Sequence, residues 1–104
     1  MSILNQKTIN HQIEFKGITL HKGKFANMRI IPSPPNTGIV FKRTDLKVNN
    51  IIVANYFNVR DAILCTTLKN EAGVCISTVE HLMAAFFGLG VDNAIVEVDQ
   101  DEIP

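Results

Sequence analysis

Apolar and polar residues alternate along several short segments of the chain, which is the pattern of strands that bury one face. In residues 25–31, the apolar Ala26, Met28 and Ile30 recur at a period of two. An earlier strand over residues 8–15 would carry on its buried face Ile9, Ile13 and Phe15. Further strands are predicted over residues 38–43, 62–68, 74–76 and 94–98. Residues 49–58 favour no single element.

Two of these strands, separated by a short loop, are expected to form a hairpin. The loop ends in Gly73, and glycine tolerates the positive φ that hairpin loops need. With the loop centred just after Glu71, Cys75 lies opposite Leu68 rather than opposite Cys65. The only two cysteines of the chain are then too misaligned for a disulfide, and they lack the Cys-x-x-Cys spacing of a zinc ribbon.

One helix is predicted, over residues 77–87. Ser77 as the N-cap and Glu80 three residues later form a capping box, and Gly88 would provide the C-terminal stop. Residues 82–87 leave this helix apolar nearly all round, so we expect it to be buried between two layers. The fold class expected from these elements is α+β, with a mostly antiparallel sheet and a buried helix.

The composition is that of one globular domain, with 46% hydrophobic and 19% charged residues among 104. The formal net charge is zero, so no global field would attract nucleic acid or an anionic membrane. The N-terminus has no signal-peptide pattern, and no apolar run reaches the roughly 20 residues of a membrane span. We therefore expect a cytoplasmic protein with no nucleic-acid partner and no stable membrane insertion.

Charge is divided unevenly between the two halves of the chain. Residues 1–52 carry eight basic and two acidic residues, a net charge of +6, whereas residues 53–104 carry two and eight, a net charge of −6. One interpretation is that the halves form complementary faces of one domain. The other is that a phosphorylated ligand is bound by some of the basic residues, namely Lys16, Lys22, Lys24, Arg29, Lys42 and Arg43.

The adjacent residues Glu80 and His81 are the strongest candidates for chemistry. Hydrolysis at a metal ion needs a neutral imidazole ligand and a nearby carboxylate base, and the partial positive charge at a helix N-terminus favours both forms. On local grounds alone, a capping glutamate and a hydrogen-bonded core histidine are the more ordinary interpretation of the pair. A catalytic zinc site also takes about three protein ligands, and His11 and His21 lie far upstream.

Two weaker candidates remain. Residues 17–23 form a glycine-flanked segment that could offer His21 and Lys22 to a ligand, but the segment lacks phosphate-loop spacing and a structural turn is the simpler interpretation. Cys65 lies between apolar and small residues, and a buried cysteine is a more ordinary interpretation than a nucleophile.

Residues 77–82 (Ser-Thr-Val-Glu-His-Leu) followed by residues 88–93 (Gly-Leu-Gly-Val-Asp-Asn) closely resemble the signature of UDP-3-O-acyl-N-acetylglucosamine deacetylases, the zinc enzymes of lipid A synthesis. Shorter matches occur in the family's order over residues 20–23, 34–39, 43–46, 59–60, 64–66, 84–85, 97–98 and 102–104. The resemblance thus covers essentially the whole chain. Thr19 and Ala62 depart from it, since the family usually has Gly and Thr there.

This resemblance implies a two-domain fold in which helices are sandwiched between two sheets and the active site lies between the domains. Residues 1–104 would form the truncated N-terminal deacetylase domain, and the second domain would be absent. His81 would ligate Zn²⁺, and Glu80 would be the general base for hydrolysis of the acetamide of a UDP-sugar lipid substrate. Leu64 and Cys65 would line the cleft near the metal as substrate-binding residues.

The family's other zinc ligands, a His and an Asp four residues apart, and its catalytic His belong to the second domain. The chain alone is therefore expected to be inactive and to need the second half of the enzyme for a complete site. An alternative from another class is a non-catalytic remnant or association module that uses the apolar helix face. A hydrolase with other ligands is a further, weaker alternative.

Overall fold

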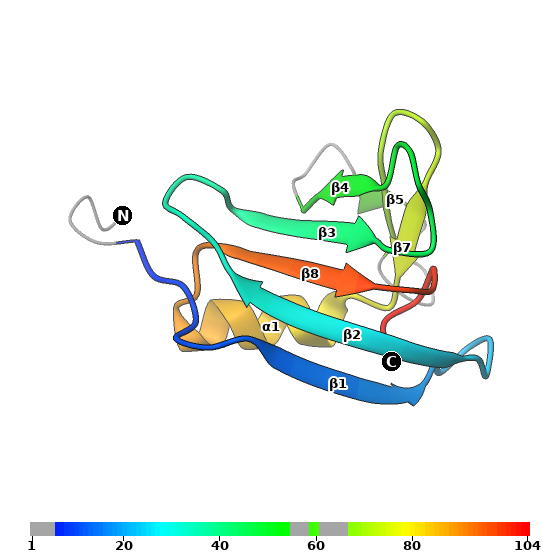
Figure 1. The fold of residues 1–104 in the computed structure, drawn as a ribbon, viewed down its shortest axis with the longest axis horizontal. Helices are drawn as coiled ribbons and strands as arrows, with labels where there is room; N and C mark the ends of the chain where they lie inside the picture. Colours follow the sequence, from blue (N-terminus) through cyan, green and yellow to red (C-terminus); the bar gives the residue numbers. More distant parts are fainter. Residues whose placement is uncertain (1–5, 55–58, 61–66) are drawn as a thin grey trace.

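The computed structural model describes residues 6–54, 59–60 and 67–104 of the chain. Within these residues the chain forms two sheets and one helix (Figure 1). In chain order the elements are β1 (Ile13–Ile18), β2 (Phe25–Pro32), β3 (Ile39–Arg43), β4 (Ile51–Val53), β5 (Val59–Arg60), β6 (Thr67–Lys69), β7 (Cys75–Ser77), α1 (Glu80–Leu89) and β8 (Ala94–Val98).

The larger sheet has five strands in the order β1-β2-β8-β3-β4, and the smaller has three in the order β5-β6-β7. Neighbouring strands are antiparallel except β3 and β8, which pair in parallel. The last strand, β8, is therefore inserted between β2 and β3, two strands that are consecutive in the chain. The fold class predicted from the sequence, α+β with a mostly antiparallel sheet, is confirmed.

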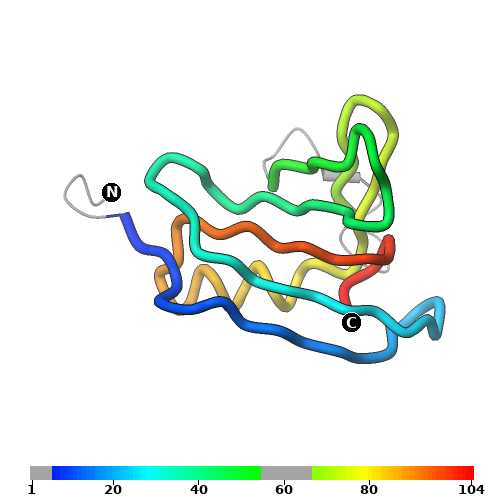
Figure 2. The backbone as a smooth tube through the Cα atoms, viewed as in Figure 1, coloured from blue at the N-terminus to red at the C-terminus, as the bar shows by residue number. Residues whose placement is uncertain are grey.

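Helix α1 lies across one face of the five-stranded sheet, and the core fills the space between them (Figure 2). The alternation predicted for β2 is confirmed, because Ala26, Met28 and Ile30 are all buried on this face. Strand β8 contributes Val96 and Val98, and α1 contributes Phe86. Burying apolar side chains from three elements that are distant in sequence is what holds the sheet and the helix together.

The first predicted strand is shifted toward the C-terminus. β1 starts at Ile13, and its register with β2 puts Ile13 opposite Ile30 and Phe15 opposite Met28. Ile13 and Phe15 thus share a face as predicted, but they are 42% and 46% exposed rather than buried, because β1 is the edge strand of the sheet. Ile9 precedes the strand. The earlier residues are held by other contacts, because the backbone of Lys7 exchanges hydrogen bonds with the residues that follow α1.

The hairpin between β6 and β7 forms, but its predicted register is wrong by one residue. Cys75 pairs with Lys69 rather than with Leu68, which pairs with Ile76. The reason is a three-residue loop closed by Gly73, whose φ is 86° and whose N–H donates to the carbonyl of Asn70 at 3.0 Å. Cys65, and with it the geometry between the two cysteines, lies outside the described residues.

The predicted helix exists, but both of its ends are wrong. Ser77 is the last residue of β7 rather than an N-cap, and the helix begins at Glu80 after Val79, which makes no side-chain cap hydrogen bond. The helix ends at Leu89, and Gly90, not Gly88, adopts the left-handed conformation that terminates it. The hydroxyl of Ser77 is committed elsewhere, because it donates to the carbonyl of Asp101.

The helix is covered on one side only. Phe86 is buried against the sheet, whereas Phe87 is 89% exposed and Leu89 is 76% exposed. The expectation that both sides are buried is therefore wrong for the described chain. Apolar side chains on the uncovered side of a helix are the kind of surface that another protein layer covers.

The two oppositely charged halves of the sequence meet in this fold. Lys22 forms an ion pair with Asp101, and Arg29 forms one with Glu97 at 2.8 Å. Each pair joins a basic residue of the first half to an acidic residue of the second. The structure therefore supports the interpretation that the halves form complementary faces of one domain.

Candidate functional site

Glu80 and His81 form the first turn of α1. Successive residues of a helix point about 100° apart, so the two side chains leave the helix in different directions. His81 is exposed, and Glu80 is half-buried. The free N–H groups of this turn carry a partial positive charge.

The backbone before α1 is fixed by contacts on both sides. Ser77 donates its N–H to the carbonyl of Asp101 at 2.9 Å and accepts from the N–H of Ile103 at 3.1 Å. Thr78 then adopts a left-handed conformation with a φ of 62°, which is uncommon for a β-branched residue and turns the chain sharply into the helix. Val79 follows and is buried in the core. The first turn of α1 is thus held from its N-terminal side.

A hollow of about 510 Å³ lies between the start of α1 and the edge strand β1. Its walls are mostly apolar, with two polar side chains, Thr78 and His81, at the helix start. The other residues that line it are Phe15, Lys16, Gly17, Ile18, Leu20, Met28, Leu82, Ala85, Ile103 and Pro104. Apolar concavities with few polar groups are the common form of ligand sites in proteins. His81, the predicted metal ligand, thus lies at the edge of such a surface.

Next to the helix start, a buried carboxylate gathers hydrogen bonds from distant parts of the chain. Glu102 is 1% exposed. Its Oε2 accepts from the N–H of His21 at 2.9 Å and from the hydroxyl of Thr78 at 2.8 Å, and it lies 2.8 Å from His21 Nδ1. Its Oε1 accepts from the N–H of Lys22 at 3.2 Å.

These contacts decide the charge of Glu102. Burial opposes ionisation and would raise its pKa, but the hydrogen bonds from His21, Thr78 and Lys22 outweigh burial and lower the pKa to about 2. Glu102 is therefore an ionised, hydrogen-bonded carboxylate at neutral pH. No local pattern in the sequence indicates a role for Glu102, although it lies in one of the short matches to the family pattern.

The glycine-flanked segment that contains His21 and Lys22 is an ordered loop between β1 and β2. Thr19 closes it, because its hydroxyl accepts from the N–H of Lys24 at 3.0 Å. The ion pair with Asp101 raises the pKa of Lys22 above its ordinary value. The structural interpretation of this segment therefore accounts for Lys22. His21 is held against Glu102, and its side chain is 42% exposed.

The described residues contain no group of three or more His, Cys, Asp or Glu side chains that could hold a metal ion. His81 therefore belongs to no cluster of three such side chains in this part of the chain. The two proposed substrate-binding residues, Leu64 and Cys65, lie outside the described residues. Among the residues that the structure covers, no helix is long and apolar enough to cross a membrane.

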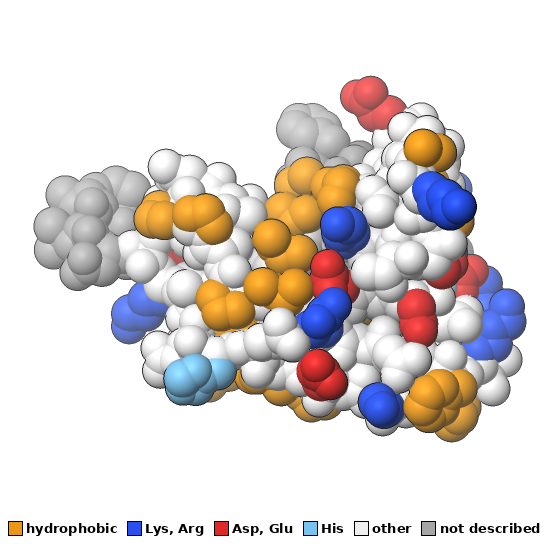
Figure 3. All heavy atoms as spheres, viewed as in Figure 1, with side chains coloured by type: hydrophobic (Ala, Val, Ile, Leu, Met, Phe, Trp, Pro, Cys, Tyr) orange, Lys and Arg blue, Asp and Glu red, His pale blue; other side chains and the backbone are white. Residues whose placement is uncertain are grey.

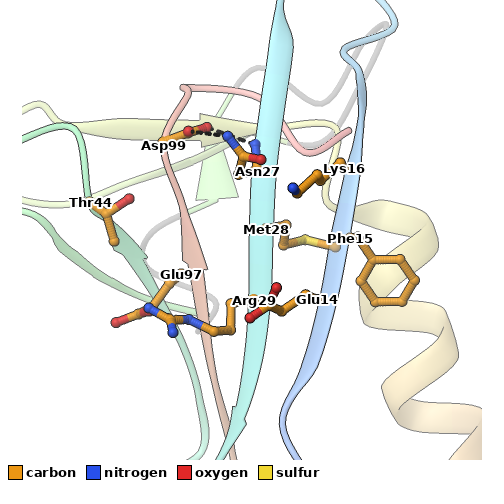
Figure 4. Close-up of a pocket in the computed structure, with 9 residues that line it drawn as sticks. All are labelled: Glu14, Phe15, Lys16, Asn27, Met28, Arg29, Thr44, Glu97 and Asp99. Atoms are coloured by element: carbon orange, nitrogen blue, oxygen red, sulfur yellow. Dashed lines mark hydrogen bonds and ion pairs between the residues drawn. The ribbon is translucent and has the colours of Figure 1, made fainter.

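The opposite face of the sheet carries both charged and hydrophobic side chains (Figure 3). In one hollow there, two pairs of polar residues engage each other: Arg29 with Glu97, and Asn27 with Asp99 through two hydrogen bonds of 2.9 Å (Figure 4). The ring of Phe15 lies on the side toward α1 (Figure 4). Because these polar groups satisfy one another, the hollow on this face is a weaker candidate than the one beside His81.

Comparison with known proteins gives one consistent answer. The family model for UDP-3-O-acyl N-acetylglycosamine deacetylase matches residues 6–104. The chain is 51% identical over 102 residues to a UDP-3-O-acyl-N-acetylglucosamine deacetylase of Pseudoalteromonas atlantica, covering 98% of this chain and 34% of that protein. The protein of the same name from Shewanella frigidimarina is 50% identical, with 95% of this chain and 32% of that protein covered. The one from Haemophilus influenzae is 49% identical, with 98% of this chain and 33% of that protein covered. The chain spans about a third of the length of these relatives.

Proposed function

Because this chain belongs to the UDP-3-O-acyl N-acetylglycosamine deacetylase family, we propose that it supplies one part of the active site of a zinc-dependent deacetylase. The observation that carries the proposal is the position of Glu80 and His81, which form the first turn of α1 where His81 and Thr78 edge an apolar hollow. The substrate would be the one in the relatives' name, a UDP-3-O-acyl-N-acetylglucosamine, and the pathway would be lipid A synthesis. The cytoplasmic location expected from the sequence is part of the same proposal.

His81 fits the role of one zinc ligand, because it is an exposed imidazole and imidazole is a common ligand of zinc. A hydrolytic zinc site takes about three protein ligands, so the others would come from outside the described residues. When bound, zinc would act as a Lewis acid toward the acetamide carbonyl and the attacking water.

Glu80 would act as the general base. Its carboxylate would accept a proton from the water whose oxygen attacks the acetamide carbon. The C–N bond then breaks, the nitrogen takes a proton and leaves as the free amine of the sugar, and acetate is the second product.

The chain would form the N-terminal domain of a two-domain enzyme, with the second half covering the outer side of α1. The exposure of Phe87 and Leu89 supports this part of the proposal, since a second sheet would remove both side chains from water. Leu64 and Cys65 would line the cleft between the two halves. The 104-residue chain alone would then hold too few ligands to be active.

The second candidate function is a non-catalytic association module. The same exposed side chains of α1 favour it, because an apolar helix face can bind a protein partner without any chemistry. The two functions differ in their need for metal.

The test uses an extended protein, made by joining this chain to the downstream two thirds of its Pseudoalteromonas atlantica relative. Zinc content and acetate release from UDP-3-O-acyl-N-acetylglucosamine are measured for the extended protein and for the 104-residue chain. Stoichiometric zinc with acetate release in the extended protein alone is the expected result. Self-association without zinc or acetate release in either protein would favour the module.

A further inference from the structure

The proposed mechanism leaves unused the most strongly hydrogen-bonded carboxylate in the described part of the chain. Glu102 joins the β1–β2 loop to the residue that turns the chain into α1, through His21 on one side and Thr78 on the other. The donors come from sequence positions 81 and 24 residues away. The contacts therefore fix two segments that the sheet pairing alone does not hold together.

The hydrogen bonds also determine where the proton of His21 lies. An ionised carboxylate can only accept hydrogen bonds, so the 2.8 Å contact between His21 Nδ1 and Glu102 Oε2 requires a proton on Nδ1. The hydroxyl of Thr78, 3.3 Å from Nδ1, already donates its proton to Glu102 and can only accept from the ring. Neutral His21 is thus protonated on Nδ1 and carries its free electron pair on Nε2.

The imidazole of His21 lies next to the candidate site. Its hydrogen-bond partner Thr78 lines the apolar hollow together with His81, three residues further along the chain. The side chain of His21 is 42% exposed although its partner carboxylate is buried. The buried side of the ring is therefore fixed, and the ring keeps accessible surface for another molecule.

We propose that Glu102 is a positioning residue of the candidate site, which holds His21 as the Nδ1-protonated tautomer so that Nε2 accepts a hydrogen bond from a hydroxyl or N–H group of the bound substrate. This inference rests on the proposed deacetylase function for the identity of the substrate, but the tautomer itself does not depend on it. Fixing a histidine through a carboxylate on its other nitrogen is a general way to orient an imidazole.

The tautomer is read from ¹⁵N-histidine spectra of the full 104-residue chain and of the extended protein, at pH 8, with His21→Gln used to assign the ring. We expect a proton on Nδ1 in both. Glu102→Gln replaces one acceptor oxygen by a donor NH₂ group and removes the negative charge that holds the proton on Nδ1, so the Nε2-protonated form should gain population. The matched control Asp101→Asn removes the neighbouring carboxylate, which pairs with Lys22, and should leave the tautomer of His21 unchanged.

Kinetics of the extended protein supply the second measurement. Glu102→Gln should lower kcat/KM by roughly tenfold or more with zinc content unchanged, whereas Asp101→Asn should stay near the parent value. A proton on Nε2 of His21 in the unmodified protein would overturn the inference, even if Glu102→Gln failed to fold. Equal kcat/KM in the two variants would also overturn it. Absence of acetate release from the parent protein would instead count against the proposed function, while the spectra still decide the tautomer.

Discussion

The hydroxyl of Ser77 donates a 3.1 Å hydrogen bond to the carbonyl of Asp101, which also accepts the N–H of Ser77 at 2.9 Å. Ser77 is thereby tied to the C-terminal segment, and its parallel bridge to Glu102 continues the pairing by one residue. This attachment brings the buried carboxylate of Glu102 next to the start of α1. It also has a measurable consequence for the free energy of unfolding of the chain.

Ser77→Ala should lower the free energy of unfolding by roughly 0.5 to 1.5 kcal/mol, the usual net value of one hydrogen bond. Because the hydroxyl does not cap α1, helix content should stay unchanged. Urea denaturation and circular dichroism measure the two quantities. Ser33→Ala is the matched control, because the Ser33 hydroxyl is buried and has no hydrogen-bond partner among the described residues, and its removal should be neutral or stabilising. Loss of helix content in Ser77→Ala would restore the capping role.

The pKa of Glu102, lowered from 4.5 to about 2, predicts a loss of stability in acid. Ionised Glu102 stabilises the folded chain at pH values above its unfolded pKa, and this contribution disappears as the pH falls from about 4.5 toward 2. The shift corresponds to on the order of 3 kcal/mol. Unfolding free energies measured at pH 7 and pH 3 should therefore differ strongly, and the difference should shrink in Glu102→Gln.

The control for this experiment is Glu71→Gln, which changes an exposed carboxylate in the β6–β7 loop. It should keep the full acid dependence of the parent chain. A parent chain as stable at pH 3 as at pH 7 would mean that the carboxylate of Glu102 is not held by the contacts described above.

The uncovered side of α1 predicts that the 104-residue chain self-associates. Phe87 and Leu89 expose most of their apolar surface, and association would remove it from water. Light scattering should show that the apparent mass decreases as the protein is diluted. Phe87→Glu should favour the monomer. Val48→Glu, at an exposed apolar side chain in the β3–β4 connection, is the control and should leave association unchanged. A monomeric parent chain at high concentration would contradict the prediction.

How far the sequence predicts the structure depends on whether a signal is local. The alternation of Ala26, Met28 and Ile30 predicts β2 correctly, because a strand with one buried face must repeat with a period of two. The Ser77 to Glu80 spacing predicts a capping box that does not form, because the backbone of Ser77 pairs with Asp101 and Ile103, a contact that no local pattern reveals.

In the candidate site, too, some residues can be found from a local sequence pattern and others only from contacts between distant parts of the chain. Glu80 and His81 are found from the sequence because they are adjacent and belong to a long family pattern. The role of Glu102 depends on side chains up to 81 residues away, so burial and hydrogen bonds must be known before it can be recognised. The predicted register of the β6–β7 hairpin is wrong for a local reason, because Gly73 takes the left-handed position of a three-residue loop.

The roles of Glu80 and His81 lead to different defects when each is replaced in the extended protein. His81→Ala should weaken zinc binding and abolish turnover together, because it removes a ligand. Glu80→Gln should keep the metal and lose the base. A glutamate that served only to stabilise the first turn of α1 would instead give lowered stability with near-normal turnover.

The most direct test of the account is therefore acetate release by Glu80→Gln, measured on extended protein whose zinc content has been determined in the same sample. The account predicts stoichiometric zinc and a turnover lower than that of the parent by roughly 10²-fold or more. Zinc at full stoichiometry with parental acetate release in Glu80→Gln would contradict it.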